Sequence, residues 1–562
     1  MNKGFSLVTR VRNAIRYLGR GDIKGLIQRL KFYRRERMLS EVHSSLSAVD
    51  GALWGIITTP HTVFVAKTIQ ERLSARGIAS EILMSTPKGV PHNIYIVLCA
   101  QMFDILPPPE RRIIFQLEQS VSSRWFTKAY LNALKNSLAV LEYSLDNIQY
   151  LADKDIKYPH VTYLPIGTSI IPPETVALDE KKYDFIFYGD SLSSKRRRKM
   201  LKALEENFRV KICNDLFGDE MAQLIRQAHA VVNIHYYENA LLEMPRIQEC
   251  ISLGVPILSE SSADQNNYPE LGGAVAFFQE GSIDSMLKAA ANMINHIADY
   301  SDEVMKSASS SSHRFTFMFD RFLVSLGVLP ATAIFDAPIY LEKNSDFIGL
   351  SLPETIDRRK VFIENKPANC AVFDGVRNIK GWIGCGSSFS ALARYALAQN
   401  LDHITIIEDD ALLPEDFHEK INIVKKYLKS NQCDWDIFSG MMASVHESAE
   451  VSNVEVYEGL TFVTINRMTS TVCNVYSKNA LSILSEWDPM DLNVDRNTID
   501  RYIENNNEIR IVVVLPFIAG HREELESTLW GFNNVRYAPM IAQSELRIQH
   551  LAEQWKHNVK SQ

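Results

Sequence analysis

Three consecutive carboxylates in the C-terminal part of the chain are the residues best suited to catalytic chemistry. Glu408, Asp409 and Asp410 directly follow the apolar run 403–407, which predicts a buried strand. Adjacent like charges repel and would destabilise a strand end that bound nothing. A divalent cation with a diphosphate removes that repulsion, because Mn²⁺ and Mg²⁺ take carboxylate and phosphate oxygens as ligands. We therefore expect a metal and diphosphate site here; the alternative is an acidic helix start at Asp410 or Asp416.

A second set of polar residues lies on a predicted helix in the middle of the chain. Glu243, Arg246 and Glu249 fall at offsets of three and six within the predicted helix 243–253, which precedes a Gly-Val-Pro turn. Glu243 and Arg246 therefore share a helix face, where Arg246 can bind a diphosphate as a planar donor fork. Gly189 ends another predicted strand and leaves backbone amides for a phosphate. The alternative for the Glu/Arg set is a structural, salt-bridged helix.

Alternating strand and helix patterns position both sets of residues. Apolar runs predict strands that alternate with helices, which favours parallel pairing, at 52–58, 79–84, 93–100, 112–117, 183–189, 210–214, 230–235 and 255–258. A third unit shows a predicted helix over 389–399 and strands over 346–352, 403–407, 435–438, 459–465 and 509–515. The serine-rich run 307–313 predicts a loop, followed by a helix near 317–326, and 328–345 predicts a linker.

Charge and composition narrow the class of protein. The 562 residues carry a net charge of −7, yet residues 1–40 hold eleven Lys and Arg against Asp22 and Glu36. Their apolar residues recur at roughly helical spacing, so this segment predicts either a basic amphipathic helix on an anionic membrane surface or a solvated helix packed on the protein. Nucleic-acid binding is not expected, because the rest of the chain is acidic and has no recognition motif.

The cysteines and the apolar runs indicate the compartment. The seven cysteines are scattered without paired spacing, which argues against a disulfide framework or a structural zinc site and favours a reducing environment. No secretory signal is visible, and the longest apolar runs are far shorter than the ~20 residues of a membrane span. We therefore expect a cytoplasmic protein, peripheral on the inner face of the membrane if the basic segment binds there.

Several motifs of the C-terminal region resemble glycosyltransferase family 25, the lipopolysaccharide-type galactosyl- and glucosyltransferases with a GT-A fold. The opening strand and arginine-bearing helix of that family are matched by Ser351-Leu352 and Arg358-Arg359, its glycine–cysteine turn by Gly384-Cys385, and its acidic motif by 407–411. The runs 469–484, 494–503 and 515–528 follow in the family's order, so the resemblance covers about 200 residues. One position departs from the family: its Ser-His pair is Ser388-Phe389 here, and phenylalanine cannot donate to a phosphate or an acceptor hydroxyl.

The resemblance implies a metal site at the acidic strand end. Asp410 is expected to ligate Mn²⁺ or Mg²⁺, and Glu408 or Asp409 to hold the ribose or assist the metal. His521 is the candidate third ligand; the alternative is a histidine on a surface loop.

The family inverts the anomeric carbon, which implies a general base that deprotonates the acceptor hydroxyl. Asp500 and Asp495 are the candidates. Each could instead be a helix cap or a surface charge.

The segment 183–260 resembles the donor-binding lobe of GT-B glycosyltransferases, chiefly through the run 233–260. This resemblance implies that Gly189, Glu243, Arg246 and Glu249 bind a nucleotide sugar, without a metal cofactor in this module. The preceding lobe would supply the acceptor side, with His61 as a candidate base. The usual seven-residue gap between two glutamates of the GT-B motif is not reproduced.

Together these patterns predict an α/β protein with two Rossmann-like, GT-B-like lobes followed by a separate GT-A-like domain. The expected divisions are a basic helical segment 1–45, lobes 46–170 and 171–330, a linker 331–345 and a transferase domain 346–562. The expected function is that of a bifunctional glycosyltransferase, which uses nucleotide-sugar donors and a cell-surface glycan or glycolipid acceptor of lipopolysaccharide or capsule type.

Three other functions remain open on the sequence. The first is a single active C-terminal transferase with the N-terminal half as an acceptor-binding scaffold, and the second is a non-catalytic, membrane-recruited assembly factor. The third, a glycoside hydrolase, is disfavoured because consecutive carboxylates at one strand end do not flank a glycosidic bond at the ~5–9 Å separation that hydrolysis needs.

Overall fold

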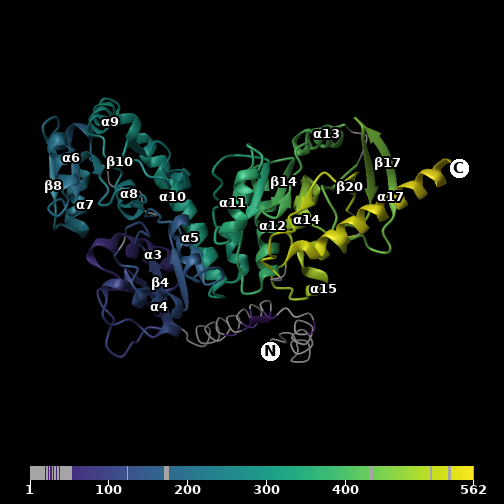
Figure 1. The fold of residues 1–562 in the computed structure, drawn as a ribbon, viewed down its shortest axis with the longest axis horizontal. Helices are drawn as coiled ribbons and strands as arrows, with labels where there is room; N and C mark the ends of the chain where they lie inside the picture. The colour runs from purple at the N-terminus through teal and green to yellow at the C-terminus, as the bar shows by residue number, and fades with distance from the viewer. Residues whose placement is uncertain are drawn as a thin grey trace. The chain divides into compact units, whose positions relative to one another are not determined.

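The computed structural model describes residues 53–560, except 123, 170–175, 431–433, 507–508 and 530–532, together with single residues between 19 and 37. The chain forms two compact units (Figure 1). Among the described residues, one comprises 53–322 with Ala337–Glu342, and the other comprises Leu323–Asp336 and 343–560. The predicted basic segment 1–45 and its membrane contact lie outside the described residues, apart from those single positions. None of the described helices combines the length and the hydropathy that a membrane span requires.

The first sheet of the unit 49–322 is wholly parallel. Its strands are β1 (Leu53–Ile57), β2 (Ala79–Leu83), β3 (Ile94–Leu98), β4 (Arg112–Gln116), β5 (Ala139–Glu142) and β6 (Val161–Tyr163), in the order β2-β1-β3-β4-β5-β6. The helices between them are α3 (Val63–Ala75), α4 (Lys128–Asn136) and α5 (Leu145–Asp153). The central strands β3 and β4 are buried along their whole length, as expected for parallel strands covered on both faces.

The second sheet of this unit is also wholly parallel. Its strands are β7 (Tyr183–Tyr188), β8 (Val210–Cys213), β9 (Ala228–Asn233), β10 (Ile257–Glu260) and β11 (Val275–Phe278), in the order β11-β10-β9-β7-β8. The helices are α6 (Lys195–Glu205), α7 (Gly218–Arg226), α8 (Met244–Ser252) and α9 (Ile283–Asn295). The predicted strands and their parallel pairing are therefore confirmed in both sheets.

The serine-rich run 307–313 is helical, so the predicted loop is wrong. It lies within α10 (Ile297–Ser325), which continues through residues whose side chains are small enough for close packing. A Cβ on Gly167 would lie 2.3 Å from the Cβ of Phe315, and the Thr168 hydroxyl donates to the Ala308 carbonyl at 2.7 Å. Ser307 donates to the carbonyl of Glu270 at 2.9 Å, so its hydroxyl is satisfied inside the helix. Tertiary packing thus overrides the turn preference of serine.

The predicted linker 328–345 also contains regular structure. A 3-10 helix, η7 (Ala331–Asp336), occupies part of it, and Ala331 and Ile334 are buried.

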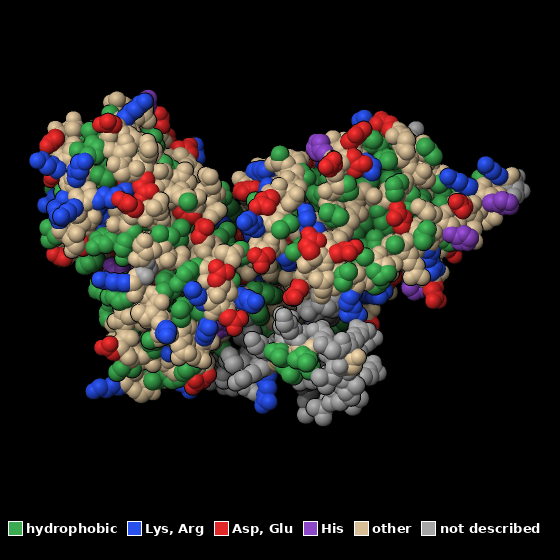
Figure 2. Space-filling model, in the orientation of Figure 1, with side chains coloured by type: hydrophobic (Ala, Val, Ile, Leu, Met, Phe, Trp, Pro, Cys, Tyr) green, Lys and Arg blue, Asp and Glu red, His purple; other side chains and the backbone are tan. Residues whose placement is uncertain are grey.

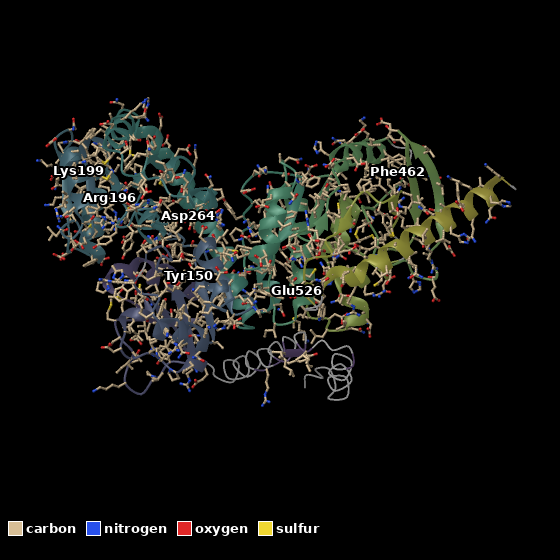
Figure 3. The ribbon with its side chains drawn as sticks, viewed as in Figure 1. Tyr150, Arg196, Lys199, Asp264, Phe462 and Glu526 are labelled. Atoms are coloured by element: carbon tan, nitrogen blue, oxygen red, sulfur yellow. The ribbon has the colours of Figure 1, made fainter. Side chains whose placement is uncertain are left out.

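The C-terminal unit contains a mixed sheet. Its strands are β12 (Phe347–Ser351), β13 (Ala371–Asp374), β14 (His403–Glu408), β16 (Ile437–Ser439), β17 (Val451–Tyr457), β18 (Leu460–Ile465), β19 (Cys473–Ser477) and β20 (Ile511–Leu515), in the order β13-β12-β14-β19-β16-β20-β18-β17. The strands β13, β12 and β14 are parallel, whereas β19 runs antiparallel to both β14 and β16. A separate two-stranded ladder joins β15 (Ala411–Leu412) to β21 (Gly520–His521). Figure 3 labels Phe462 on β18, where its ring stacks on Tyr427.

The helices of this unit lie between its strands along the chain and after its last strand. They are α11 (Ile356–Asn365), α12 (Gly381–Ala398), α13 (Phe417–Lys429), α14 (Lys478–Ser485), α15 (Val494–Asn497), α16 (Ile499–Glu504), the 3-10 helix η8 (Asn534–Tyr537) and α17 (Ala538–Lys560). Helix α12 begins before the predicted helix 389–399. Gly386 allows its close approach to Trp487, because a Cβ there would lie 2.3 Å from the indole ring. The indole in turn donates to the carbonyl of Asn497 at 3.0 Å, which ties α12 to the segment carrying α15 and α16.

Candidate functional site

The acidic end of β14 is the first candidate site. Asp409 and Asp410 are 4% and 6% exposed, although each carries a carboxylate. Asp409 accepts hydrogen bonds from the Ser351 hydroxyl at 2.8 Å and from Nε of Arg358 at 2.9 Å. Nη1 of Arg358 also donates to the carbonyl of Glu526, which Figure 3 labels. Asp409 is thus bound to β12 and α11, and its role in the structure is to fix the strand end.

Asp410 faces a different set of partners. Its Oδ2 lies 2.9 Å from Nη2 of Arg358, 3.2 Å from Nε2 of His521 and 3.3 Å from Nδ2 of Asn534. The ladder of β15 with β21 places His521 opposite Ala411, and the Arg522 amide donates to the Asp410 carbonyl. Burial opposes ionisation, but the charges of Arg358 and His521 hold the pKa of Asp410 well below its usual range.

Three buried atoms at this site have no hydrogen-bond partner. They are Oδ1 of Asp410, Nδ1 of His521 and Oδ1 of Asn534. Unsatisfied buried polar atoms are rare in folded proteins and indicate a missing ligand or water. Within the described part of the chain, no three His, Cys, Asp or Glu side chains come together as a metal site. The fit to a divalent cation therefore depends on one carboxylate, one imidazole and the amide oxygen of Asn534, with other positions left to substrate oxygens.

Glu408 is the least enclosed of the three carboxylates. It accepts from the Thr471 hydroxyl at 2.6 Å. Desolvation, and then the neighbouring charge of Asp410, raise the pKa of Glu408 above its ordinary value. The three adjacent carboxylates thus differ in their partners, and the pKa values of Glu408 and Asp410 are shifted in opposite directions.

The two candidate bases lie in different surroundings. Burial, together with the charges of Glu408, Asp500 and Asp410, raises the pKa of the Cys385 thiol. Burial and the same three carboxylates also act on Tyr537, whose pKa rises to about 12. Asp500, at the start of α16, therefore lies within electrostatic reach of the acidic strand end.

Asp495 is exposed on α15, and its backbone amide is capped by the side chain of Asn493. Its position is that of a surface charge at a helix start. Asp500 and Asp495 both remain predictions as catalytic residues, but only Asp500 is grouped with the carboxylates.

Phe389, the departure from the family pattern, belongs to the hydrophobic core. It is fully buried and packs edge-on against Tyr476, with ring centroids 6.1 Å apart. Its neighbour Ser388 donates to the Gly384 carbonyl and accepts from the Val376 amide, both at 2.8 Å. None of these contacts of Phe389 and Ser388 involves the acidic strand end.

The second candidate site is a cleft of about 270 Å³ in the unit 49–322. The elements of the first sheet contribute His61, Cys99, Glu118, Gln119 and Tyr143 to its wall. The elements of the second sheet contribute Tyr188, Gly189, Glu243, Arg246 and Glu249. The structure thus brings together the four residues predicted to bind the donor of the N-terminal module.

Two guanidinium groups meet at the carboxyl end of β7. Gly189 has φ = +121°, which disfavours any residue with a Cβ. A Cβ there would lie 3.0 Å from Nη2 of Arg246 and 3.8 Å from Nη1 of Arg197. Arg197 is 3% exposed, held by the carbonyls of Ile234 and Asp190. Two buried cations beside a glycine form a place where the backbone and an anionic ligand can approach closely.

The glutamates of α8 have separate roles in this cleft. Glu243 pairs with Arg246 at 2.5 Å and with Arg197 at 3.3 Å. Burial favours its neutral form, but these two cations outweigh burial and lower the pKa of Glu243. Glu249 accepts from the Tyr188 hydroxyl at 2.9 Å, and burial raises the pKa of Glu249. The salt-bridged helix considered as the alternative is therefore present, and it lines the cleft.

His61 lies on the opposite wall. Its Nδ1 is 3.1 Å from the Thr59 hydroxyl and its Nε2 is 3.7 Å from Sγ of Cys99. Burial lowers the pKa of His61, which favours the neutral imidazole that a general base requires.

Some of the basic residues at the start of α6 lie on the surface and others lie in the interior. Figure 2 shows Lys and Arg side chains gathered over α6 and β8. Lys195, Arg198 and Lys199 are exposed, and Figure 3 labels Lys199 on the outer side of the helix. Arg196, also labelled, donates inward to Glu260 at 2.6 Å, and the buried Arg197 pairs with Glu243, a residue of the cleft wall, at 3.3 Å.

Several residues of the two sites were not identified from the sequence. Asn534 lies 124 residues from Asp410 along the chain, and Thr471 lies 63 residues from Glu408. No local pattern marks either residue, because both are placed by tertiary contacts. Arg197 belongs to a run of five basic residues, 195–199, and only its burial distinguishes it from its neighbours.

Comparison with known proteins finds similarity in structure and none in sequence. No protein-family model and no curated protein matches the chain. Sucrose-phosphate synthase from Thermosynechococcus elongatus is 12% identical with a TM-score of 0.34, covering 49% of this chain and 99% of that one. HepE from Anabaena in complex with UDP and glucose is 11% identical with a TM-score of 0.36, covering 50% and 100%. WaaG, a glycosyltransferase involved in lipopolysaccharide biosynthesis, is 10% identical with a TM-score of 0.36, covering 50% and 99%. No residue assignment follows from similarity at this level.

Proposed function

We propose that this chain is a glycosyltransferase with two nucleotide-sugar-binding modules, which adds sugars to a cell-surface glycan or glycolipid of lipopolysaccharide or capsule type. The observation that carries the proposal is the buried carboxylate of Asp410, whose Oδ2 lies 3.2 Å from Nε2 of His521, while its Oδ1 and the His521 Nδ1 have no hydrogen-bond partner. This pair lies at the carboxyl end of β14, within the segment whose motifs resemble family 25. Ligands of α/β sheets bind at such strand ends.

In the C-terminal module, Asp410, His521 and Asn534 would hold Mn²⁺ or Mg²⁺. When bound, the cation supplies positive charge that offsets the charge developing on a leaving diphosphate. Asp409 keeps the strand end in place through Ser351 and Arg358.

Glu408 and Asp500 complete the proposed C-terminal site. Asp500 would accept the proton of the acceptor hydroxyl in an inverting displacement, and its charge, like those of Glu408 and Asp410, acts on Cys385 and Tyr537. Glu408, bound to Thr471, is available to hydrogen-bond the ribose or the metal-bound substrate.

In the N-terminal module, Arg246, Arg197 and Gly189 would bind the donor diphosphate without a metal. A planar guanidinium suits phosphate oxygens, and the glycine leaves room for the ligand beside the backbone. Glu249 is positioned by Tyr188 to accept from the ribose. The acceptor would enter from the opposite wall, where His61 is the candidate base.

One observation favours the alternative in which the N-terminal half only binds the acceptor. Glu243 already pairs with both arginines, so the protein's own carboxylate occupies part of the cationic site. Under this alternative, Arg246→Ala would leave every transfer reaction intact.

The deciding experiment is calorimetric titration of the full chain with a panel of nucleotide sugars, with and without Mn²⁺. We expect one metal-dependent site that is lost in Asp410→Ala, and one metal-independent site that survives there and is lost in Arg246→Ala. Asp495→Ala is the matched control, because it removes an exposed carboxylate of the same unit. Failure of every nucleotide sugar to bind, with or without metal, would refute the proposed function.

A further inference from the structure

The cleft of the unit 49–322 holds one of the protein's own carboxylates at the place proposed for a donor diphosphate. Oε2 of Glu243 lies 2.5 Å from Nη1 of Arg246, and Oε1 lies 3.3 Å from Nη2 of Arg197. The same guanidiniums approach Gly189, where a Cβ would be 3.0 and 3.8 Å from their nitrogens. The carboxylate and an incoming phosphate would therefore compete for the same two cations.

This carboxylate leaves part of the donor capacity of the site unused. Nε of Arg246 is buried without a hydrogen-bond partner. Glu243 is the carboxylate that forms an ion pair with both arginines, so one carboxylate is shared between two guanidinium groups. A ligand with more oxygens and more negative charge than a carboxylate can satisfy more of these donors.

Glu243 is placed where its side chain can move aside. It is the N-cap residue of α8 and lines the cleft, with 16% of its side chain exposed. Its backbone is held from both sides, because the Leu242 amide donates to Asp264 and Arg246 and Ile247 donate to the Glu243 carbonyl. A rotation of the side chain alone would therefore release the arginines without unfolding the start of the helix.

We infer that Glu243 is a resident counter-anion, which a diphosphate must displace from Arg197 and Arg246, and that it thereby sets the affinity of this module for its donor. The inference rests on the proposed function of the cleft as a diphosphate site. Displacement favours ligands with several negative charges, so a diphosphate binds and a monoanion does not compete well with the internal carboxylate. Glu243 thus weakens donor binding rather than contributing a contact to the donor.

The test is the affinity of the full chain for inorganic pyrophosphate, measured by calorimetry in EDTA and in the Asp410→Ala background, so that the C-terminal site does not contribute. Glu243→Gln keeps the shape of the side chain and removes its charge. We expect its dissociation constant for pyrophosphate to fall roughly tenfold or more, because the lost charge lies within contact distance of both cations. UDP serves as a second probe and should follow the same order.

The matched control is Glu249→Gln, which removes the same charge from the same helix. The Glu249 carboxylate binds the Tyr188 hydroxyl, not an arginine, so we expect a much smaller gain in affinity. Equal gains in the two variants would show a general effect of charge and overturn the inference. Unchanged or weaker binding in Glu243→Gln would overturn it as well, because Glu243 would then be a residue that positions the arginines.

Arg246→Ala separates this inference from the proposed function. Weaker pyrophosphate binding in that variant establishes the anion site, whatever Glu243→Gln does. Unchanged binding removes the anion site and overturns both. Thermal unfolding of each variant checks the fold. Glu243→Ala removes the carboxylate without leaving an amide, and it should also bind pyrophosphate more tightly than the unsubstituted chain does.

Discussion

Replacing Arg358 by methionine should destabilise the C-terminal unit and make its stability depend on a divalent cation. The guanidinium is 10% exposed and contacts both Asp409 and Asp410, whose side chains are 6% and 9% exposed. Methionine fills similar volume but leaves two neighbouring carboxylates without their cation. The carboxylates then face each other in a poorly solvated site, where repulsion is strong.

The size of the effect follows from the burial of all three groups. Breaking a buried ion pair by removing one partner costs about 3–5 kcal/mol, because the remaining charge is uncompensated. For a unit of this size, about 1 kcal/mol lowers the melting temperature by roughly 2–4 °C. We therefore expect a fall of roughly 10 °C in the transition of the C-terminal unit.

Added Mn²⁺ should restore part of this loss. A ligand that binds only the folded state stabilises it by about 2.7 kcal/mol at one hundred times its dissociation constant. The cation replaces the missing charge at Asp410, so the gain in melting temperature should be larger for the variant than for the unsubstituted chain. The assay is calorimetric or fluorescence-detected unfolding in EDTA and in Mn²⁺.

Arg359→Met is the matched control for this prediction. Arg359 is the next residue on α11, pairs with Asp374 at 2.8 Å and is similarly enclosed, with 13% of its side chain exposed. It should lose stability without any recovery in Mn²⁺. Equal recovery of both variants, or no recovery of Arg358→Met, would refute the argument that Asp410 binds the cation.

Two further predictions concern the same unit. Phe389→His should lower the free energy of unfolding by about 1–3 kcal/mol, because it buries a polar ring in the core, and should leave nucleotide-sugar affinity unchanged in calorimetry. A gain in affinity would instead place this side chain in the site. His403 and then Lys425 lower the pKa of Asp346, so its contribution to stability is present above about pH 4 and is lost as the pH falls further. Asp346→Asn should therefore lower the free energy of unfolding in urea by about 0.5–1 kcal/mol at pH 7, a small effect because the carboxylate is partly exposed. The loss should become progressively smaller between pH 4 and pH 2. An equal loss at every pH would contradict this role of Asp346.

The alternation of strands and helices was predictable because it depends on local patterns. The apolar runs at β3 and β4 have the length and composition of parallel strands, and they pair as expected. The run at β14 forms the expected buried strand, which pairs parallel with β12 and antiparallel with β19. The helix over the serine-rich run 307–313 was not predictable. Its stability comes from the close contact of α10 with Gly167 and Thr168, which lie about 140 residues away in sequence.

The partners of the site residues were harder to predict than the residues themselves. The acidic strand end and the Glu/Arg helix are contiguous in sequence, so their chemistry is visible there. Asn534 and Thr471 lie far from the carboxylates that they contact, and the burial of Arg197 is a property of the folded helix. Sequence patterns record which residues lie on one element, whereas contacts between elements depend on how the chain packs.

The structure also changes the argument that the acidic triplet requires a metal. Repulsion among Glu408, Asp409 and Asp410 would call for a cation if all three were ionised and unpaired. Instead, Asp409 is compensated by Arg358, and desolvation and the charge of Asp410 favour the protonated form of Glu408. Asp410 alone combines a lowered pKa with a buried oxygen that has no partner. The case for a cation therefore rests on Asp410 and its neighbours His521 and Asn534, and it would stand even if the other two carboxylates were only structural.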